Sequence, residues 1–442
     1  MSVPRGRRGV SVPHAGLSKG SVVELTIEKP AFGGRMIARH DGQVVLVSGA
    51  IPGERVTAIV ERVEKRLAFA TVQAVIEASP HRRTSAFDPA CGGSLYAHID
   101  YHTQVALKSE VVVDAFTRIG RMPPPGPVPV AHSPERGYRM RARLHAHGGR
   151  AGFYLEGTHQ LCEAAPTGQL TDAALGSVQA ALAALGSLAS EVVSIEIAEN
   201  VAADERALHI ELRAADPLPV PALVAAVAAA QLTGCSSRSA TGTFARAGEP
   251  VVSDPLHALT GGRAANGSLR RHAASFFQGN RFLLAALVGH VLDAIPGGGD
   301  VLDLYAGVGL FSVSLAAAGR QGIVAVEGDR ESGADLLRNA AAYAGSMMAV
   351  VGLVEDYVRR PGARPATVIV DPPRSGISQE AMDAIRRLSA DRIVYVSCDP
   401  PTMARDARRL VDAAYVLASL TGYDLFPSTP HVEVVGVFER EK

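Results

Sequence analysis

The chain has 442 residues, of which 47% are hydrophobic and 20% are charged, so it can form two to three folded domains. Its 44 basic and 44 acidic side chains balance, which argues mildly against a nucleic-acid surface spread over the whole molecule. The longest apolar runs, such as 222–230, are too short to cross a bilayer, and no apolar signal segment follows the basic start. We therefore expect no membrane association.

The charge is distributed unevenly along the chain. Residues 1–83 carry 13 basic and 7 acidic side chains, whereas residues 266–442 carry 18 and 20. Any electrostatic contact with RNA is therefore expected at the N-terminal end. Residues 1–17 hold Pro, Gly and Arg without periodicity and are predicted to be a disordered basic tail.

The cysteines give a prediction about location. Cys91, Cys162, Cys235 and Cys398 are widely spaced and form no dense disulfide framework. This pattern favours the reducing cytoplasm as the setting of the protein.

Residues 18–78 read as short strands separated by turns, which predicts a small β-barrel. The predicted strands are 22–27, 43–48, 55–63 and 68–76. The run Gly33-Gly-Arg-Met-Ile-Ala38 and the turn Asp41-Gly42 resemble the TRAM domain, an OB-like RNA-binding barrel. A barrel with a structural or protein-binding role is the alternative.

Residues 79–265 are predicted to hold a linker and a central α+β domain. A helix is expected near 101–119, and the proline-rich run 122–128 can be neither helix nor central strand. The predicted strands are 138–145, 150–154, 192–198 and 208–212, and the predicted helices are 171–188 and 221–231.

From residue 266 strands and helices alternate to the end of the chain, which predicts a doubly wound parallel sheet. The predicted strands are 300–305, 322–327, 347–351, 367–371, 392–397, 414–426 and 432–439. The predicted helices are 282–295, 310–318, 331–343, 379–388 and 403–411.

The first motif in this region is Asp303-Leu-Tyr-Ala-Gly307-Val-Gly309, a strand that enters a tight glycine turn and then a helix. Such a turn lets a ligand approach the backbone beside the amino end of a helix. Glu327 ends the next strand and can accept both ribose hydroxyls of a nucleoside. The dinucleotide fingerprint is incomplete because position 312 is Ser, so S-adenosylmethionine fits better than a dinucleotide.

Three further motifs follow buried strands. Asp371 begins a double-proline turn, Cys398 ends the strand 392–397, and His431 and Glu433 stand at the start of the last strand. A nucleophile and a carboxylate base at one sheet edge suit addition–elimination chemistry. The alternatives are a rigid turn for Asp371, a buried structural thiol for Cys398 and a solvated pair for His431 and Glu433. Thr402 is expected to cap the helix after Cys398.

Five stretches occur in an order that resembles one enzyme family. They are Phe276-Phe-Gln278-Gly-Asn280, the glycine turn, Asp371-Pro-Pro-Arg-Ser-Gly376, Ser397-Cys398-Asp-Pro-Pro-Thr-Met-Ala-Arg-Asp406 and Pro427-Ser-Thr-Pro-His-Val-Glu433. With the TRAM-like start they look like the class I S-adenosylmethionine-dependent RNA uracil-C5 methyltransferases, and the resemblance covers most of the chain. It implies a multi-domain protein with a small N-terminal barrel, a central α+β domain and a Rossmann-like α/β methyltransferase domain over 266–442.

The resemblance also implies roles for individual residues. Four residues would bind S-adenosylmethionine, namely Gln278, Tyr305, Glu327 and Asp371. Cys398 would add to C6 of uracil, and Glu433 would remove the C5 proton. The related cytosine-C5 enzymes would place a Cys beside the Pro of the Asp-Pro-Pro loop, and the absence of one here favours uracil.

The chain departs from the family pattern at the cysteines that hold an iron–sulfur cluster in many members. Cys91 matches one ligand, but Ser85, Ser94 and Thr167 stand at the other three positions, with Cys162 out of register. Because a cubane cluster needs four ligands, we expect no cluster and no other metal site. Gly279 and Leu310 replace residues expected to be Val and Asn near the cofactor.

The leading hypothesis is an enzyme that methylates C5 of a uridine in structured RNA, and the TRAM-like barrel favours 23S ribosomal RNA over transfer RNA. We expect a monomer. The alternatives are a transfer RNA uracil-C5 methyltransferase, a non-catalytic RNA-binding protein and a small-molecule methyltransferase.

Overall fold

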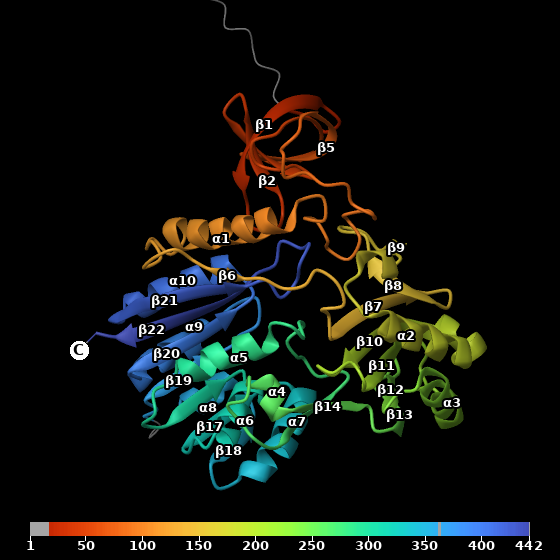
Figure 1. The fold of residues 1–442 in the computed structure, drawn as a ribbon, viewed down its shortest axis with the longest axis vertical. Coiled ribbons are helices and arrows are strands. Elements are labelled where there is room, and N and C mark those ends of the chain that lie inside the picture. The colour runs from red at the N-terminus through yellow and green to blue at the C-terminus, as the bar shows by residue number, and fades with distance from the viewer. Residues whose placement is uncertain (1–16, 361–363, 442) are drawn as a thin grey trace, which may run out of the picture. The chain divides into compact units, whose positions relative to one another are not determined.

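The computed structural model describes residues 17–360 and 364–441, which form two compact units, Met1–Arg82 and Arg83–Lys442 (Figure 1). Except for residue 17, the predicted basic tail lies outside the described residues.

The first unit contains a closed five-stranded barrel with strand order β1-β2-β3-β5-β4. Its strands are β1 (Val22–Pro30), β2 (Met36–His40), β3 (Gln43–Ser48), β4 (Arg55–Val63) and β5 (Leu67–Glu77). Alternate residues such as Val45 and Val47 are fully buried, as expected for strands with one face in a core. Asp41 and Gly42 both have positive φ and connect β2 to β3 in a two-residue turn. The predicted barrel is confirmed.

A seven-stranded sheet forms the core of the middle region, with strand order β13-β12-β11-β10-β7-β8-β9. Its strands are β7 (Arg141–His147), β8 (Arg150–Tyr154), β9 (Leu161–Cys162), β10 (Val192–Glu199), β11 (Arg206–Leu212), β12 (Gly234–Arg238) and β13 (Phe244–Gly248). The helices α2 (Asp172–Leu185) and α3 (Val220–Ala230) pack their apolar faces into its core. Sequence reasoning missed β12 and β13, because Gly-Cys-Ser-Ser-Arg has little β-branched character.

One helical segment of this region, Asp172–Glu191, is long and apolar enough to cross a membrane by length and composition. The prediction that the apolar runs are too short to cross a bilayer is therefore wrong for this segment. Its buried side chains, which include Ala174, Val178 and Leu182, belong to the core under the seven-stranded sheet. Packing within the domain therefore accounts for the apolar side chains on the buried face of this segment, in which 39% of the most apolar window is buried.

The C-terminal sheet has eight strands in the order β18-β17-β16-β19-β20-β22-β21-β6. Its strands are β6 (Val130–Ala131), β16 (Val301–Leu304), β17 (Ile323–Glu327), β18 (Met347–Val351), β19 (Thr367–Val370), β20 (Arg392–Ser397), β21 (Tyr415–Tyr423) and β22 (Glu433–Arg440). The five strands from β18 to β20 are parallel, as predicted. The strand β22 is antiparallel to both of its neighbours, β20 and β21, because β21 returns directly into β22 without a crossover helix.

Helices cover both faces of this sheet, so successive strand residues enter two different cores. Ile369 packs with α5 and α6 on one face, whereas Val368 and Val370 pack with α9 and α10 on the other. The helices are α5 (Leu284–Asp293), α6 (Leu310–Ala317), α7 (Arg330–Ala340), α8 (Val354–Val358), α9 (Gln379–Leu388) and α10 (Pro400–Val411). A hairpin of β14 (Val251–Pro255) and β15 (Ser268–His272), with α4 (Leu256–Leu259) in its connection, precedes them.

Two parts of the chain before residue 132 also join the C-terminal sheet. The helix α1 (Tyr101–Arg118) packs against α10, and Phe116 is fully buried in the core that they share (Figure 1). The strand β6 pairs in parallel with β21 through Val130 and Ala131. The carboxylate of Asp100 caps α1 by accepting a hydrogen bond from Thr103 N.

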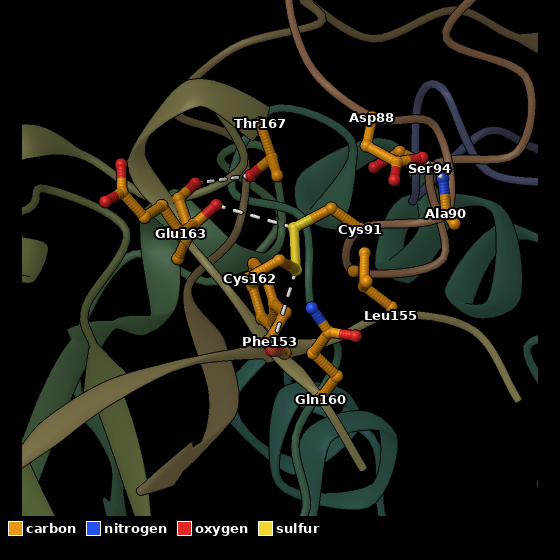
Figure 2. The surroundings of a disulfide bond; sticks show 12 residues. Asp88, Ala90, Cys91, Ser94, Phe153, Leu155, Gln160, Cys162, Glu163 and Thr167 are labelled. Carbon is orange, nitrogen blue, oxygen red and sulfur yellow. Dashed lines mark hydrogen bonds between the residues drawn. A yellow bond between two sulfur atoms is a disulfide. The ribbon is translucent and has the colours of Figure 1, made fainter. Parts of the chain in front are cut away.

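A disulfide bond joins Cys91 to Cys162, which lie 71 residues apart in the sequence (Figure 2). It connects the loop before α1 to the short edge strand β9. Cys91 is buried, and its sulfur lies 3.4 Å from the carbonyl oxygen of Glu163 (Figure 2). No pattern in the sequence predicts this pairing, and Cys162 is out of register for a cluster ligand. The two thiols bond to each other here, and the absence of a cluster stays a prediction.

Replacing Cys91 by serine should lower the free energy of unfolding by about 4 kcal/mol, because the bond closes a long loop in the unfolded chain. Urea titrations with and without a dithiol reductant measure this difference. Under reducing conditions the free energy of unfolding of the wild-type protein should fall to nearly that of the variant. A wild-type protein that does not respond to reductant and matches the variant would contradict the prediction.

Candidate active site

A cavity of about 650 Å³ opens at the carboxyl ends of the parallel strands of the C-terminal sheet. The six site residues predicted from the sequence all line it, and they are Gln278, Tyr305, Glu327, Asp371, Cys398 and Glu433. The structure therefore brings together residues that are spread over 156 positions of the chain, from 278 to 433.

The glycine turn after β16 forms one wall of the cavity. Tyr305 has φ 61°, which is rare for a residue with a side chain and indicates local backbone strain. Gly309 has φ 94°, and a Cβ atom there would lie 2.7 Å from Val313 and 2.9 Å from Leu336. Only glycine therefore fits the point where the turn enters α6.

Glu327, the last residue of β17, fastens this turn. One carboxylate oxygen accepts a hydrogen bond from Gly307 N at 2.7 Å, and the other accepts one from Asp329 N at 2.6 Å. These bonds hold the carboxylate at the cavity wall. Each oxygen keeps a second lone pair with which it can accept a ribose hydroxyl.

Asp371 lines the cavity and lies near a second carboxyl group, the fully buried Asp303, and this pair favours a cationic ligand. Burial raises the pKa of Asp371 to about 7, and the nearby Asp303 adds to the shift. Burial likewise raises the pKa of Asp303 to about 7. Gln278 donates a hydrogen bond to Asp371 at 3.3 Å and favours its charged form. A ligand with positive charge would stabilise both carboxylates, and this fits the sulfonium and ammonium groups of S-adenosylmethionine.

Cys398 lies at the end of the buried strand β20 and is partly exposed to the cavity. Burial raises the pKa of its thiol to about 11, and the neighbouring Glu433 contributes. The helix α10 begins directly after it at Pro400, and Asp399 caps it by accepting a hydrogen bond from Thr402 N at 2.9 Å. The prediction that Thr402 is the cap is wrong, because proline is well tolerated in the first helical turn and the helix starts earlier.

Glu433 is the first residue of β22 and is only 4% exposed. Burial raises the pKa of its carboxyl group well above the ordinary value, and Asp371 adds to the effect. The alternative of a solvated His431–Glu433 pair is therefore wrong for Glu433. His431 is not among the residues that line the cavity, and burial together with Arg374 lowers its pKa to about 4.

Sequence reasoning gave Arg374 no role, but the structure places it in the cavity beside both reacting groups. The positive charge of its guanidinium group lowers the pKa of the Cys398 thiol, and it also lowers the pKa of Glu433. The signal was present in the Asp371-Pro-Pro-Arg374 motif, because a rigid turn carries its arginine to the sheet edge that also holds Asp371.

The raised thiol pKa predicts how Cys398 reacts with iodoacetamide. Only the thiolate reacts, so at pH 8 a thiol with a pKa of about 11 is ionised to roughly one part in a thousand. The alkylation rate should therefore keep rising with pH up to at least about pH 10. Arg374→Gln should slow the reaction at every pH below this, because the pKa rises further when the cation is lost.

Mass spectrometry of the Cys398 peptide measures this rate. Arg386→Gln on the outer surface of α9 is the control and should react as the wild type does. A rate that levels off near pH 8 would contradict the prediction.

Comparison with known proteins agrees with this geometry. A family model described as tRNA (Uracil-5-)-methyltransferase matches residues 363–442, and a TRAM domain model matches residues 17–73. The 23S rRNA (uracil(1939)-C(5))-methyltransferase RlmD of Methylococcus capsulatus is 33% identical, over 94% of this chain and 96% of its own. The protein of the same description from Bordetella avium is 32% identical, over 94% and 90%.

A solved structure shares the fold. The Pyrococcus abyssi tRNA (uracil-54, C5)-methyltransferase in complex with S-adenosyl-L-homocysteine superposes with a TM-score of 0.70 at 22% identity. The match covers 94% of this chain and 100% of that one. The chain thus belongs to the family of S-adenosylmethionine-dependent RNA uracil-C5 methyltransferases.

Proposed function

We propose that the protein methylates C5 of a uridine in 23S ribosomal RNA, with Cys398 as the nucleophile and Glu433 as the base. The observation that carries the proposal is the meeting of Cys398, Arg374 and Glu433 in the cavity that also holds the Glu327 turn. The relatives described as 23S rRNA methyltransferases support ribosomal RNA as the substrate. We further propose that the protein acts as a monomer in the cytoplasm.

The proposed roles follow from the chemistry of uracil, whose C5 atom is a poor nucleophile. Addition of the Cys398 thiolate at C6 converts the ring to an enolate, in which C5 carries electron density. Arg374 favours the thiolate form through its positive charge beside the sulfur. After C5 has formed its bond to the methyl group, Glu433 takes the proton that remains on C5, and elimination of the thiolate from C6 restores the double bond and frees the enzyme.

S-adenosylmethionine, when bound, supplies the electrophilic methyl group that C5 receives. Glu327 would hold the ribose of the cofactor. Asp371 and Gln278 would lie beside the charged end of the cofactor. Tyr305 would form part of the turn that surrounds the cofactor. The target base must leave its stack to reach Cys398, because the sulfur lies within a cavity and not on an open surface.

The test is methyl transfer from labelled S-adenosylmethionine to bulk RNA that lacks 5-methyluridine. The RNA is separated by size, digested and analysed by nucleoside mass spectrometry. Label in 5-methyluridine of large ribosomal RNA supports the proposal. Label in transfer RNA would favour the alternative that the description of the matching family model suggests. No label from protein that binds the cofactor would favour a non-catalytic RNA-binding role.

A further inference from the structure

The segment 424–432, here called the strap, connects β21 to β22 and leads directly into Glu433. Phe426 of the strap also lines the cavity, so the strap shapes the site at two points. Ser428, in its middle, has φ 64°, which a side-chain-bearing residue rarely adopts. Strained backbone of this kind persists only where the surroundings hold it in place.

Most of the side chains that hold the strap belong to the chain before residue 141, far from the strap in sequence. Lys108 donates to Phe426 O at 3.1 Å and to the carboxylate of Asp424 at 2.5 Å. Gln104 accepts a hydrogen bond from Ser428 N at 2.8 Å. Tyr138 donates a longer bond to Pro427 O at 3.4 Å. The first part of the strap, residues 424–428, is thus held by side chains that precede the domain carrying Cys398.

Gln104 and Lys108 stand four residues apart on α1, so they lie on one face of the helix. That face is buried, and its neighbours Val105 and Val112 pack in an apolar core. Lys108 and Asp424 are 1% and 0% exposed. A buried ion pair is weak evidence for stability, because apolar side chains of similar volume often serve as well. The Lys108–Asp424 ion pair next to the strap is better explained by the backbone conformation that it imposes on the strap.

We propose that Lys108 and Gln104 are positioning residues that hold the strap so that Glu433 and Phe426 face the reacting uracil. This inference rests on the proposed function, in which Glu433 removes the C5 proton. Neither side chain is among the residues that line the cavity, so both act through the strap. Helix α1 lies outside the predicted methyltransferase domain. Under this proposal it nevertheless contributes to catalysis, because it positions the strap.

The test is the double variant Lys108→Met/Asp424→Asn, which removes both buried charges while it keeps the side-chain volumes. A misplaced base should lower kcat by roughly 10- to 100-fold. The affinity for S-adenosylmethionine should not change, because Glu327 and Asp371 are untouched. The fraction of enzyme joined covalently to RNA in the steady state should rise, since release needs Glu433. A denaturing gel with labelled RNA measures that fraction.

Phe116→Leu is the matched control, because it weakens the packing of the same helix away from the strap. It should lower stability without an increase in covalent adduct. If the double variant does not fold, Gln104→Leu is measured in the same way, because it removes the bond to Ser428 N. Wild-type kcat in the folded variant, or a lower kcat without more adduct, would overturn the inference.

Two reference measurements separate this result from a failure of the proposed function. The wild-type protein should form a stable adduct with RNA that carries 5-fluorouridine, because fluorine cannot leave C5 as a proton does. Glu433→Gln should accumulate adduct on ordinary RNA. If either reference fails, the proposed function fails; if both succeed and the double variant behaves as wild type, only the positioning role is wrong.

Discussion

Replacing Cys398 by alanine is expected to abolish methyl transfer, with kcat reduced by at least about 10⁴-fold. Without the thiolate no adduct forms at C6, and C5 stays too weak a nucleophile to accept a methyl group. Binding of S-adenosylmethionine should be unchanged, because the Glu327 turn lies on other strands. Isothermal titration with the cofactor and a methyl-transfer assay measure the two effects separately.

Cys235 provides the control for this experiment. It is fully buried in the seven-stranded sheet, and burial raises the pKa of its thiol to about 12. Cys235→Ala should keep its methyltransferase activity. Turnover that survives in Cys398→Ala would rule out the covalent mechanism.

Glu433→Gln is expected to lower kcat by roughly 10²- to 10⁴-fold, because an amide cannot take the proton from C5. Addition of Cys398 and methyl transfer come before that step and do not need Glu433, so the enzyme should remain attached to its methylated RNA. A band of protein joined to RNA on a denaturing gel measures this. A variant that turns over slowly but never accumulates the adduct would show that another group is the base.

Glu439→Gln is the matched control on the same strand. Glu439 lies near the far end of β22, where its carboxylate pairs with Arg392 at the surface. The Glu439→Gln variant should retain wild-type activity and form no additional adduct, because the same change in charge then lies away from the cavity.

Much of the catalytic domain could be predicted from local sequence. Parallel strands such as β19 and β20 are continuous β-branched runs that are buried on both faces, and their carboxyl ends meet at one sheet edge. This is why Asp371 and Cys398 could be placed at one site before their distance was known. Glu327 followed from the same logic, because it ends the strand next to the glycine turn.

The features that the sequence did not predict depend on contacts between segments that are distant in sequence. No local pattern shows that Cys91 and Cys162 are neighbours, because their pairing follows from how the loop before α1 lies on β8 and β9. Nothing in the local sequence distinguishes Lys108 and Asp424 from charged residues at the surface. Only the tertiary structure buries the two side chains together. Strand β6 has two residues after a proline-rich run, which is too short for any periodicity.

The pairing of β6 with β21 has a consequence for where the chain can be divided. A fragment that begins at residue 266 would contain every residue proposed to take part in the chemistry, yet it would leave β21 as an open edge strand. It would also uncover the face of α10 on which α1 packs. Such a fragment should aggregate and not fold alone. The smallest fragment that folds on its own should therefore begin before α1. Recombination that exchanges the catalytic domain between related proteins would have to include that helix.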